Sequence, residues 1–196
     1  MAVTCASLSG NVVGASCRNS SAAIQGDLVL INWEDWEAAK ADSSLVTYSN
    51  GVYSKITLPT GKNGVHVTSH DKAFSAMYEL VVGTYVNSFR HGVTMRVFEK
   101  TQAIKTFLSK IGYGRFVAIV RNLDSNNEET KFEVYGGEKG LVASANSFDS
   151  ANTDGVIGEL TIQSADDALE SAVPDSFYVT DLETTIEAYE ALYPAA

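Results

Sequence analysis

The stretch VTMRVFEKTQAIKTFLSKIGYGRFVAIV, residues 93–120, predicts a strand, a helix and a second strand in direct succession. Four apolar side chains in its middle are spaced i, i+3, i+4 and i+7, which places them on one face of a helix. They are Ile104, Phe107, Leu108 and Ile111. The helix is expected to begin near Thr101, and Gly112 provides its C-terminal stop. The residues on either side of it, 93–99 and 115–120, are strand candidates.

Strand patterns continue in both directions from this stretch. They cover residues 28–33, 52–58, 64–70 and 73–82 before it, and residues 131–136, 140–148 and 156–164 after it. Asn50-Gly51 is a two-residue hairpin signal. A short helix is expected over 34–42, and a last one from Thr180 to Tyr193, where Thr180 and Glu183 form a capping-box pattern. About eight strands and two or three helices predict a mainly β, α+β fold, an antiparallel β-barrel or sandwich with a central helix and a C-terminal helix.

The chain has 196 residues, the size of one ordinary domain. It shows no linker and no internal repeat, so we expect a single domain over residues 1–196, with the small and polar residues 1–26 as an N-terminal arm. Within the predicted strand 73–82, apolar side chains occupy both faces. Phe74, Tyr78, Leu80 and Val82 lie on one face, and Met77 and Val81 on the other. A strand of this kind is expected to be buried on both sides, against the core and against another element or subunit.

The balance of charge excludes some classes of protein. The chain has 14 Lys and Arg against 24 Asp and Glu, a net charge of -10, so a nucleic-acid binder with a basic footprint is not expected. Residues 1–139 hold 14 basic and 13 acidic side chains, a charge of +1, whereas residues 140–196 hold 11 acidic and no basic ones. This acidic third is interpreted either as a solvated face that keeps the protein soluble or as a surface that must not hold a polyanion. No apolar run approaches the ~20 residues of a membrane span, and the N-terminus does not have the pattern of a secretory signal.

The histidines do not predict a metal site. His66 and His70 are four residues apart beside Asp71, but on a strand two such positions lie ~13 Å apart. His91, next to Gly92, is interpreted as a turn residue. No catalytic, cofactor-binding or metal-binding residue is therefore predicted.

Other polar stretches are interpreted as turns. The glycine-rich residues 61–64 and 136–140 lack the spacing of a phosphate-binding loop. The carboxylate pairs Asp166-Asp167 and Glu128-Glu129 lie in polar turns, and residues 149–155 lack the ligand spacing of a calcium loop. Without a convergent set of ionisable residues, a structural or assembly protein is favoured over an enzyme.

The two cysteines, Cys5 and Cys17, are too few for a disulfide scaffold and match no zinc spacing. We expect free thiols in a reducing cytosol, with a single bridge that closes an N-terminal loop as the alternative.

Several stretches follow one another in an order typical of one family of virion proteins. They are Cys5 and Cys17 ahead of a strand that ends in Leu30-Ile31-Asn32, SNGVYSKITL at 49–58, residues 89–120, Tyr135-Gly136 with Gly140-Leu141, VIGELTIQS at 156–164, and the closing helix. In this layout the chain resembles the tail tube proteins of long-tailed bacteriophages, especially those of phages that infect Bacteroidetes. The likeness covers most of the chain and is one of layout, without a diagnostic residue.

The resemblance implies a virion structural protein and not an enzyme, with no cofactor. Subunits of such proteins form rings, commonly hexamers, and the rings stack into a hollow tail tube. Inner strands of neighbouring subunits join into one β-barrel around the channel through which phage DNA is ejected into the host. Arms and long hairpins reach the next ring, and residues 1–26 and the connection at 85–92 are the candidates for this role.

The partners that the resemblance implies are further copies of the chain and the tape measure, terminator and baseplate proteins, with no membrane. The protein would be made in the host bacterial cytoplasm and located in the virion tail. DNA would pass the lumen without specific binding, and we expect some acidic side chains to face the channel, where they repel phosphates.

Other interpretations stay open. One is another virion component, such as a head–tail connector or a tail terminator, or the tube of an injection system. A second is a monomeric binding module or secreted surface domain, which predicts a Cys5–Cys17 disulfide. An enzyme is the third.

Overall fold

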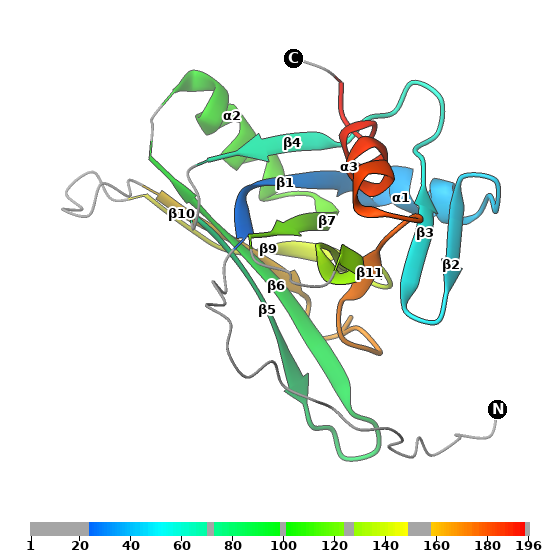
Figure 1. The fold of residues 1–196 in the computed structure, drawn as a ribbon. Helices are drawn as coiled ribbons and strands as arrows, with labels where there is room; N and C mark the ends of the chain where they lie inside the picture. Colours follow the sequence, from blue (N-terminus) through cyan, green and yellow to red (C-terminus); the bar gives the residue numbers. More distant parts are fainter. Residues whose placement is uncertain (1–23, 70–72, 99–100, 124–127, 149–157, 195–196) are drawn as a thin grey trace, which may run out of the picture.

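The computed structural model describes residues 24–69, 73–98, 101–123, 128–148 and 158–194 (Figure 1). The strands in these ranges are β1 (Ile24–Asn32), β2 (Val46–Ser49), β3 (Val52–Ile56), β4 (Val65–Thr68), β5 (Phe74–Val81), β6 (Ser88–Val97), β7 (Arg115–Asn122), β8 (Phe132–Tyr135), β9 (Leu141–Phe148), β10 (Gly158–Ser164) and β11 (Asp175–Phe177). The helices are α1 (Trp33–Lys40), α2 (Gln102–Ile111) and α3 (Leu182–Glu190), with a 3-10 turn at Glu128–Thr130.

The strands belong to one mixed sheet. Its main path runs β2-β3-β11-β8-β7-β9-β10-β6-β5, and β1 joins it by pairing with β7 on one side and with β4 on the other. The mainly β, α+β class is confirmed. Among the described strands the path ends at β2 and at β5 without closing, so one chain does not complete a barrel.

The centre of the fold is the β1–β7 pair, which is buried on both faces. In β1, Leu28 and Leu30 pack into one apolar core, whereas Val29 and Ile31 pack into the other. Residues 117–120 of β7 divide between the two cores in the same way. A continuous apolar run, instead of an alternating one, is what a strand with two buried faces requires.

The helices cover the two cores unequally. Trp36 of α1 and Tyr189 of α3 are fully buried in the core that contains Val29 and Ile31. On the other side, α2 buries only Ile111 completely, and Phe107 and Leu108 of its predicted apolar face are partly buried against that core. The hydroxyl of Thr101 accepts a hydrogen bond from the backbone N–H of Ile104 over 3.2 Å, which confirms the predicted start of α2.

Local signals also predicted the hairpins. Asn50 and Gly51 have φ values of 53° and 81°, the left-handed conformation that a two-residue turn between antiparallel strands needs. The hairpins β2–β3, β7–β8 and β9–β10 are all formed, although the turn at 149–155 lies outside the described residues.

Two predictions about element ends are corrected, and a third is confirmed. The N-cap of α3 is Asp181, not Thr180, because the extended backbone of Asp181 directs its carboxylate onto the N–H of Thr184, 2.8 Å away. Gly112 is the C-cap of α2, as predicted, with φ −63° in the right-handed region. Residues 24–26 belong to β1, where Ile24 is buried, and the remainder of the expected arm, together with Cys5 and Cys17, lies outside the described residues.

Candidate functional site

The longest hairpin of the protein, β5–β6, extends beyond the rest of the described fold (Figure 1). Its strands stay in register from Phe74↔Met95 at the base to Val81↔Ser88 near the tip. Phe74 and Met95 are buried in the core. Since β5 is the last strand of the sheet path, its outer edge pairs with no strand in the described chain.

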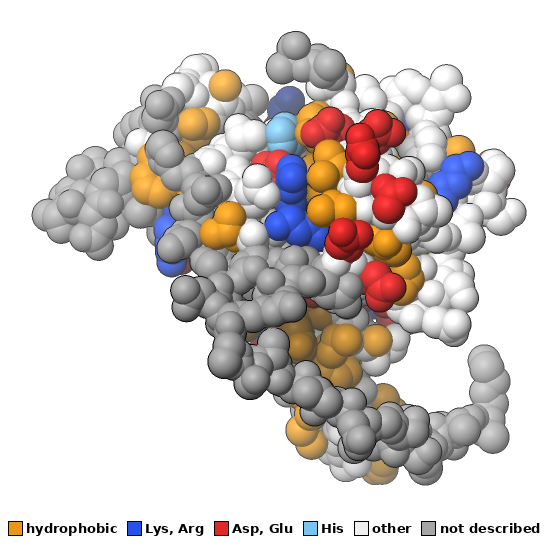
Figure 2. Space-filling view, viewed as in Figure 1, with side chains coloured by type: hydrophobic (Ala, Val, Ile, Leu, Met, Phe, Trp, Pro, Cys, Tyr) orange, Lys and Arg blue, Asp and Glu red, His pale blue; other side chains and the backbone are white. Residues whose placement is uncertain are grey.

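Apolar side chains are exposed on both faces of this hairpin. Met77 is 51% exposed and Leu80 is 53% exposed, and the two lie on opposite faces because side chains alternate along a strand. Tyr78 shares the face of Leu80, and Tyr85 at the tip is 96% exposed. Figure 2 shows hydrophobic atoms at the lower end of the view, where the hairpin projects. Apolar side chains occupy both faces of residues 73–82, as predicted, and toward the tip the segments that the structure describes cover neither face.

The middle of the hairpin, where His91 lies opposite Tyr78, is joined to the body by the ring of His91. The prediction of His91 as a turn residue was wrong. Residues 88–92 continue strand β6, so the expected connection at 85–92 is shorter than predicted. The ring of His91 is buried because both nitrogens find partners: Nδ1 accepts from the backbone N–H of Gly136 over 3.2 Å, and Nε2 lies 2.9 Å from the carbonyl oxygen of Ala172. Burial lowers the pKa of His91 below its ordinary value.

Residues 136–140 form a turn, as predicted, and its backbone N–H groups hold an anion that belongs to the protein itself. The buried carboxylate of Glu170 accepts hydrogen bonds from the N–H groups of Glu138 and Lys139, over 2.9 Å and 3.0 Å. Burial raises the pKa of Glu170, although the two N–H groups act in the opposite direction. Glu170 also bridges to Phe89 of β6 through backbone hydrogen bonds, so this loop, the turn and strand β6 of the hairpin form one unit.

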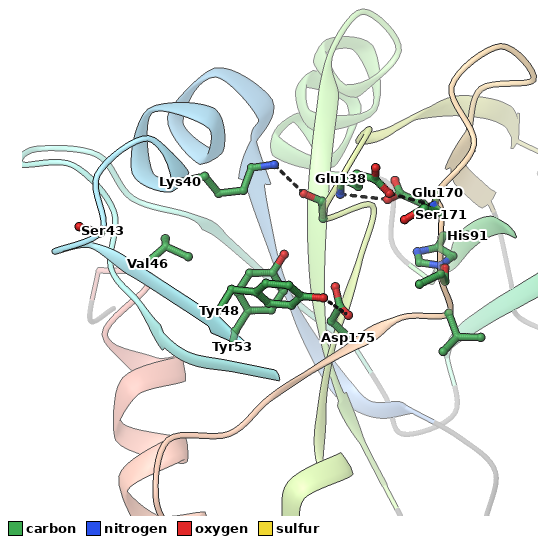
Figure 3. Close-up of a pocket in the computed structure, with 13 residues that line it drawn as sticks. Lys40, Ser43, Val46, Tyr48, Tyr53, His91, Glu138, Glu170, Ser171 and Asp175 are labelled. Atoms are coloured by element: carbon green, nitrogen blue, oxygen red, sulfur yellow. Dashed lines mark hydrogen bonds between the residues drawn. The ribbon is translucent and has the colours of Figure 1, made fainter. Parts of the chain in front are cut away.

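Beside that unit lies a cavity of about 540 Å³, between the β2–β3 hairpin and residues 137 and 170–175. Figure 3 shows the side chains of Lys40, Tyr48, Tyr53, Glu138 and Asp175 around it. The hydroxyl of Tyr48 donates a hydrogen bond to Asp175 over 3.1 Å. Sequence reasoning missed this set, because its members come from separate stretches that only the folded chain brings together.

The structure separates the other residues considered in the sequence. His66 lies on β4, where its ring stacks on Tyr193 at 4.0 Å and its Nε2 is 3.8 Å from a carboxylate oxygen of Asp27. Asp166 accepts a hydrogen bond from Arg90 over 2.6 Å, and Arg90 also bonds Glu79 on β5. Gly61 has φ 78° and lies in a turn, as predicted. His70, Asp71 and residues 149–155 lie outside the described residues.

The acidic residues near the C-terminus serve different purposes. Figure 2 shows a cluster of acidic side chains over α3, where Glu183, Glu187 and Glu190 are exposed. Glu159 on β10 pairs with Arg96 on β6 over 3.3 Å, while Glu170 is buried. Part of the acidic third is therefore structural, and part is a solvated surface.

In the part of the chain that the structure describes, no three His, Cys, Asp or Glu side chains come together as metal ligands. The helices of that part are also too short or too polar to cross a membrane. Comparison of the chain with protein-family models, with curated proteins and with solved structures finds no match.

Proposed function

We propose that this protein is the repeating subunit of a hollow tube of the phage tail-tube type, in which rings of copies stack into the conduit for DNA. One observation carries the proposal. No strand of the described residues pairs with the outer edge of the β5–β6 hairpin, and apolar side chains are exposed on both of its faces. The layout of the elements, a helix between strands and a closing helix, agrees with the same function.

An edge strand with free N–H and C=O groups is a template for pairing with another chain. Apolar side chains on a projecting ribbon leave water when a neighbour covers them, at about 25 cal/mol per Å² of apolar area. If the β5 edge were added to the sheet of a neighbouring copy, its backbone groups would be paired and its apolar side chains would be buried in the same contact. If each copy repeats the contact around a ring, no edge of this kind is left, which is how barrels dispose of their edges.

The charge of the chain suits passage of DNA without retention. A duplex carries about one negative charge per 1.7 Å of axis, and proteins hold it mainly by neutralising phosphates with Lys and Arg. Here the net charge is -10, and several of the basic side chains are paired, among them Arg90 and Arg96. An assembled wall of such subunits would offer the duplex few cations.

The experiment compares the assembly of the full chain with that of two matched variants. Tyr85 at the hairpin tip and Tyr113 after α2 are both 96% exposed. We expect the wild type and Tyr113→Asp to form rings or tubes in electron micrographs. The double variant Tyr85→Asp/Leu80→Asp should remain a folded monomer. Equal thermal stability of all variants as monomers would show that the substitutions act on assembly alone.

A wild type that stays monomeric at high concentration would favour a binding module over a tube subunit. Single rings that never stack would favour a connector or terminator.

A further inference from the structure

The cavity beside β2 and β3 has the composition of a binding site that the tube does not use. Three carboxyl groups line it, those of Glu138, Glu170 and Asp175, against a single lysine, Lys40. Lys40 is already engaged: its ammonium group lies 2.8 Å from Glu37 and donates to the carbonyl of Gly137 over 3.0 Å. The cavity is therefore an anionic space, and its one cation is bound at the rim.

Not all of the negative charge in the cavity is satisfied. Both oxygens of Glu170 accept backbone hydrogen bonds, and one oxygen of Glu138 accepts from the N–H of Ser171. Asp175 accepts from Tyr48 with one oxygen, and its other oxygen has no hydrogen-bond donor among the residues that the structure describes. Burial, and then the nearby charge of Glu138, raise the pKa of Asp175 despite the bond from Tyr48. A cation placed there would favour the charged form of Asp175 and so act against both causes.

Tyr53 supplies an independent sign of a ligand. The residue is only 5% exposed, and its side chain points into the cavity (Figure 3). Its hydroxyl makes no hydrogen bond within the described chain and is open to the cavity, so it is available to bond a ligand there. The rings of Tyr48 and Tyr53 lie 4.7 Å apart between centroids and form an aromatic wall next to Asp175.

We propose that this cavity binds an organic cation, an alkylammonium or guanidinium group. Its N–H donors would bond the free oxygen of Asp175 and the hydroxyl of Tyr53, and its charge would lie near the faces of the tyrosine rings, an arrangement that favours such cations. A metal ion fits less well, because the described residues offer no three-ligand cluster and the space of about 540 Å³ far exceeds one ion. The cation is either a free small molecule or a Lys or Arg side chain of another copy.

The test is calorimetric titration with agmatine, which carries both groups, into the full-length monomeric double variant Tyr85→Asp/Leu80→Asp and into the wild type. We expect saturable binding of one agmatine per chain, weakened about tenfold by Asp175→Asn and several-fold by Tyr53→Phe. The Tyr53→Phe change removes only a hydroxyl, so the fold is retained. Glu187→Gln, which removes a carboxylate from the exposed face of α3, is the matched control and should bind as the parent does.

Two outcomes would overturn the proposal: absence of saturable binding, or equal affinity in Asp175→Asn and Glu187→Gln. Equal binding of the neutral analogue butylurea would also overturn it, in favour of an uncharged ligand. The source of the cation follows from assembly of the wild type. Agmatine inhibits that assembly if a side chain of another copy fills the cavity, and leaves it unchanged if the natural ligand is a free molecule. The titration results do not depend on tube formation, because binding is measured on the monomeric variant, so failure of this proposal and failure of the tube proposal can be told apart.

Discussion

The backbone N–H of Gly136 donates to Nδ1 of His91 over 3.2 Å, and this bond fixes the protonation state of the ring. Because Nδ1 acts as an acceptor, the proton of the neutral ring is on Nε2, which donates to the carbonyl of Ala172 over 2.9 Å. A second proton, on Nδ1, would face the N–H of Gly136, so that two hydrogen-bond donors would point at each other. The bond therefore couples strand β6 of the β5–β6 hairpin to pH.

The stability of the protein is expected to fall as the pH is lowered from about 7.5 to about 5. Burial holds the pKa of His91 below its ordinary value, while the charge of Glu138 and the bond to Ala172 oppose the shift. As the pH falls through about 6.5, the unfolded chain therefore binds a proton at His91 that the folded chain does not bind. The free energy of unfolding then falls by up to about 1.4 kcal/mol per pH unit. Urea unfolding across this range measures the loss, and His91→Gln should show a shallower dependence. An identical slope in the variant would contradict the assignment.

Two leucines should separate folding from assembly. Leu30 on β1 is 1% exposed, and Leu80 on β5 is 53% exposed. Leu30→Ala is expected to lower the free energy of unfolding by about 2–5 kcal/mol, since it leaves a cavity in a packed core. Leu80→Ala should change it by no more than about 0.5 kcal/mol and should weaken assembly. A large destabilisation by Leu80→Ala would mean that the hairpin packs against its own chain.

Asp27→Asn should stabilise the protein at neutral pH. Burial raises the pKa of Asp27, although Arg121 and His66 act in the opposite direction, and one oxygen, Oδ1, is buried without a partner in the described chain. Because the pKa of Asp27 is higher in the folded chain than the ordinary value of about 3.9, the folded chain holds this proton more tightly than the unfolded chain. Asp27 therefore destabilises the protein as the pH rises from about 3.9 through the folded pKa, and this loss is absent below about 3.9. Thermal unfolding of both proteins should therefore show an advantage for Asp27→Asn at pH 7 that shrinks in acid. An advantage independent of pH would point to another cause.

The assembled protein is expected not to retain duplex DNA at physiological salt. Replacement of Glu183, Glu187 and Glu190 of α3 by lysine converts an exposed acidic cluster into a basic one, and should create binding that falls steeply with salt. Gel mobility of a duplex fragment measures this. Salt-dependent retention by the wild type would argue against a conduit that lets DNA slide.

The sequence predicted elements whose signal is local. The apolar spacing of α2, the continuous apolar residues of β1 and the Asn50-Gly51 turn are each recognisable within a few residues of sequence. All three elements are present in the structure. The predicted N-cap of α3 is one residue too early. Thr180 and Asp181 are both favourable N-cap residues, and only the backbone conformation decides between them. The sequence did not predict β11, because this strand has only three residues and depends on pairing with β3 and β8.

The site depends on contacts that no local pattern encodes. The loop that carries Glu170 meets the 136–140 turn some thirty residues away in sequence, and the ring of His91 is buried only because that turn and Ala172 supply its partners. The two apolar faces of residues 73–82 were readable from alternation. That the outer edge of β5 pairs with none of the described strands, however, follows from the order of the whole sheet.

Cryo-electron microscopy of the purified full chain tests the central claim most directly, because it shows what covers the outer edge of β5. The account predicts closed rings, stacked into tubes, in which each β5 edge and the side chains of Met77, Tyr78 and Leu80 are buried by a neighbouring copy. A monomer, or an assembly in which β5 and these side chains remain in solvent, would contradict it.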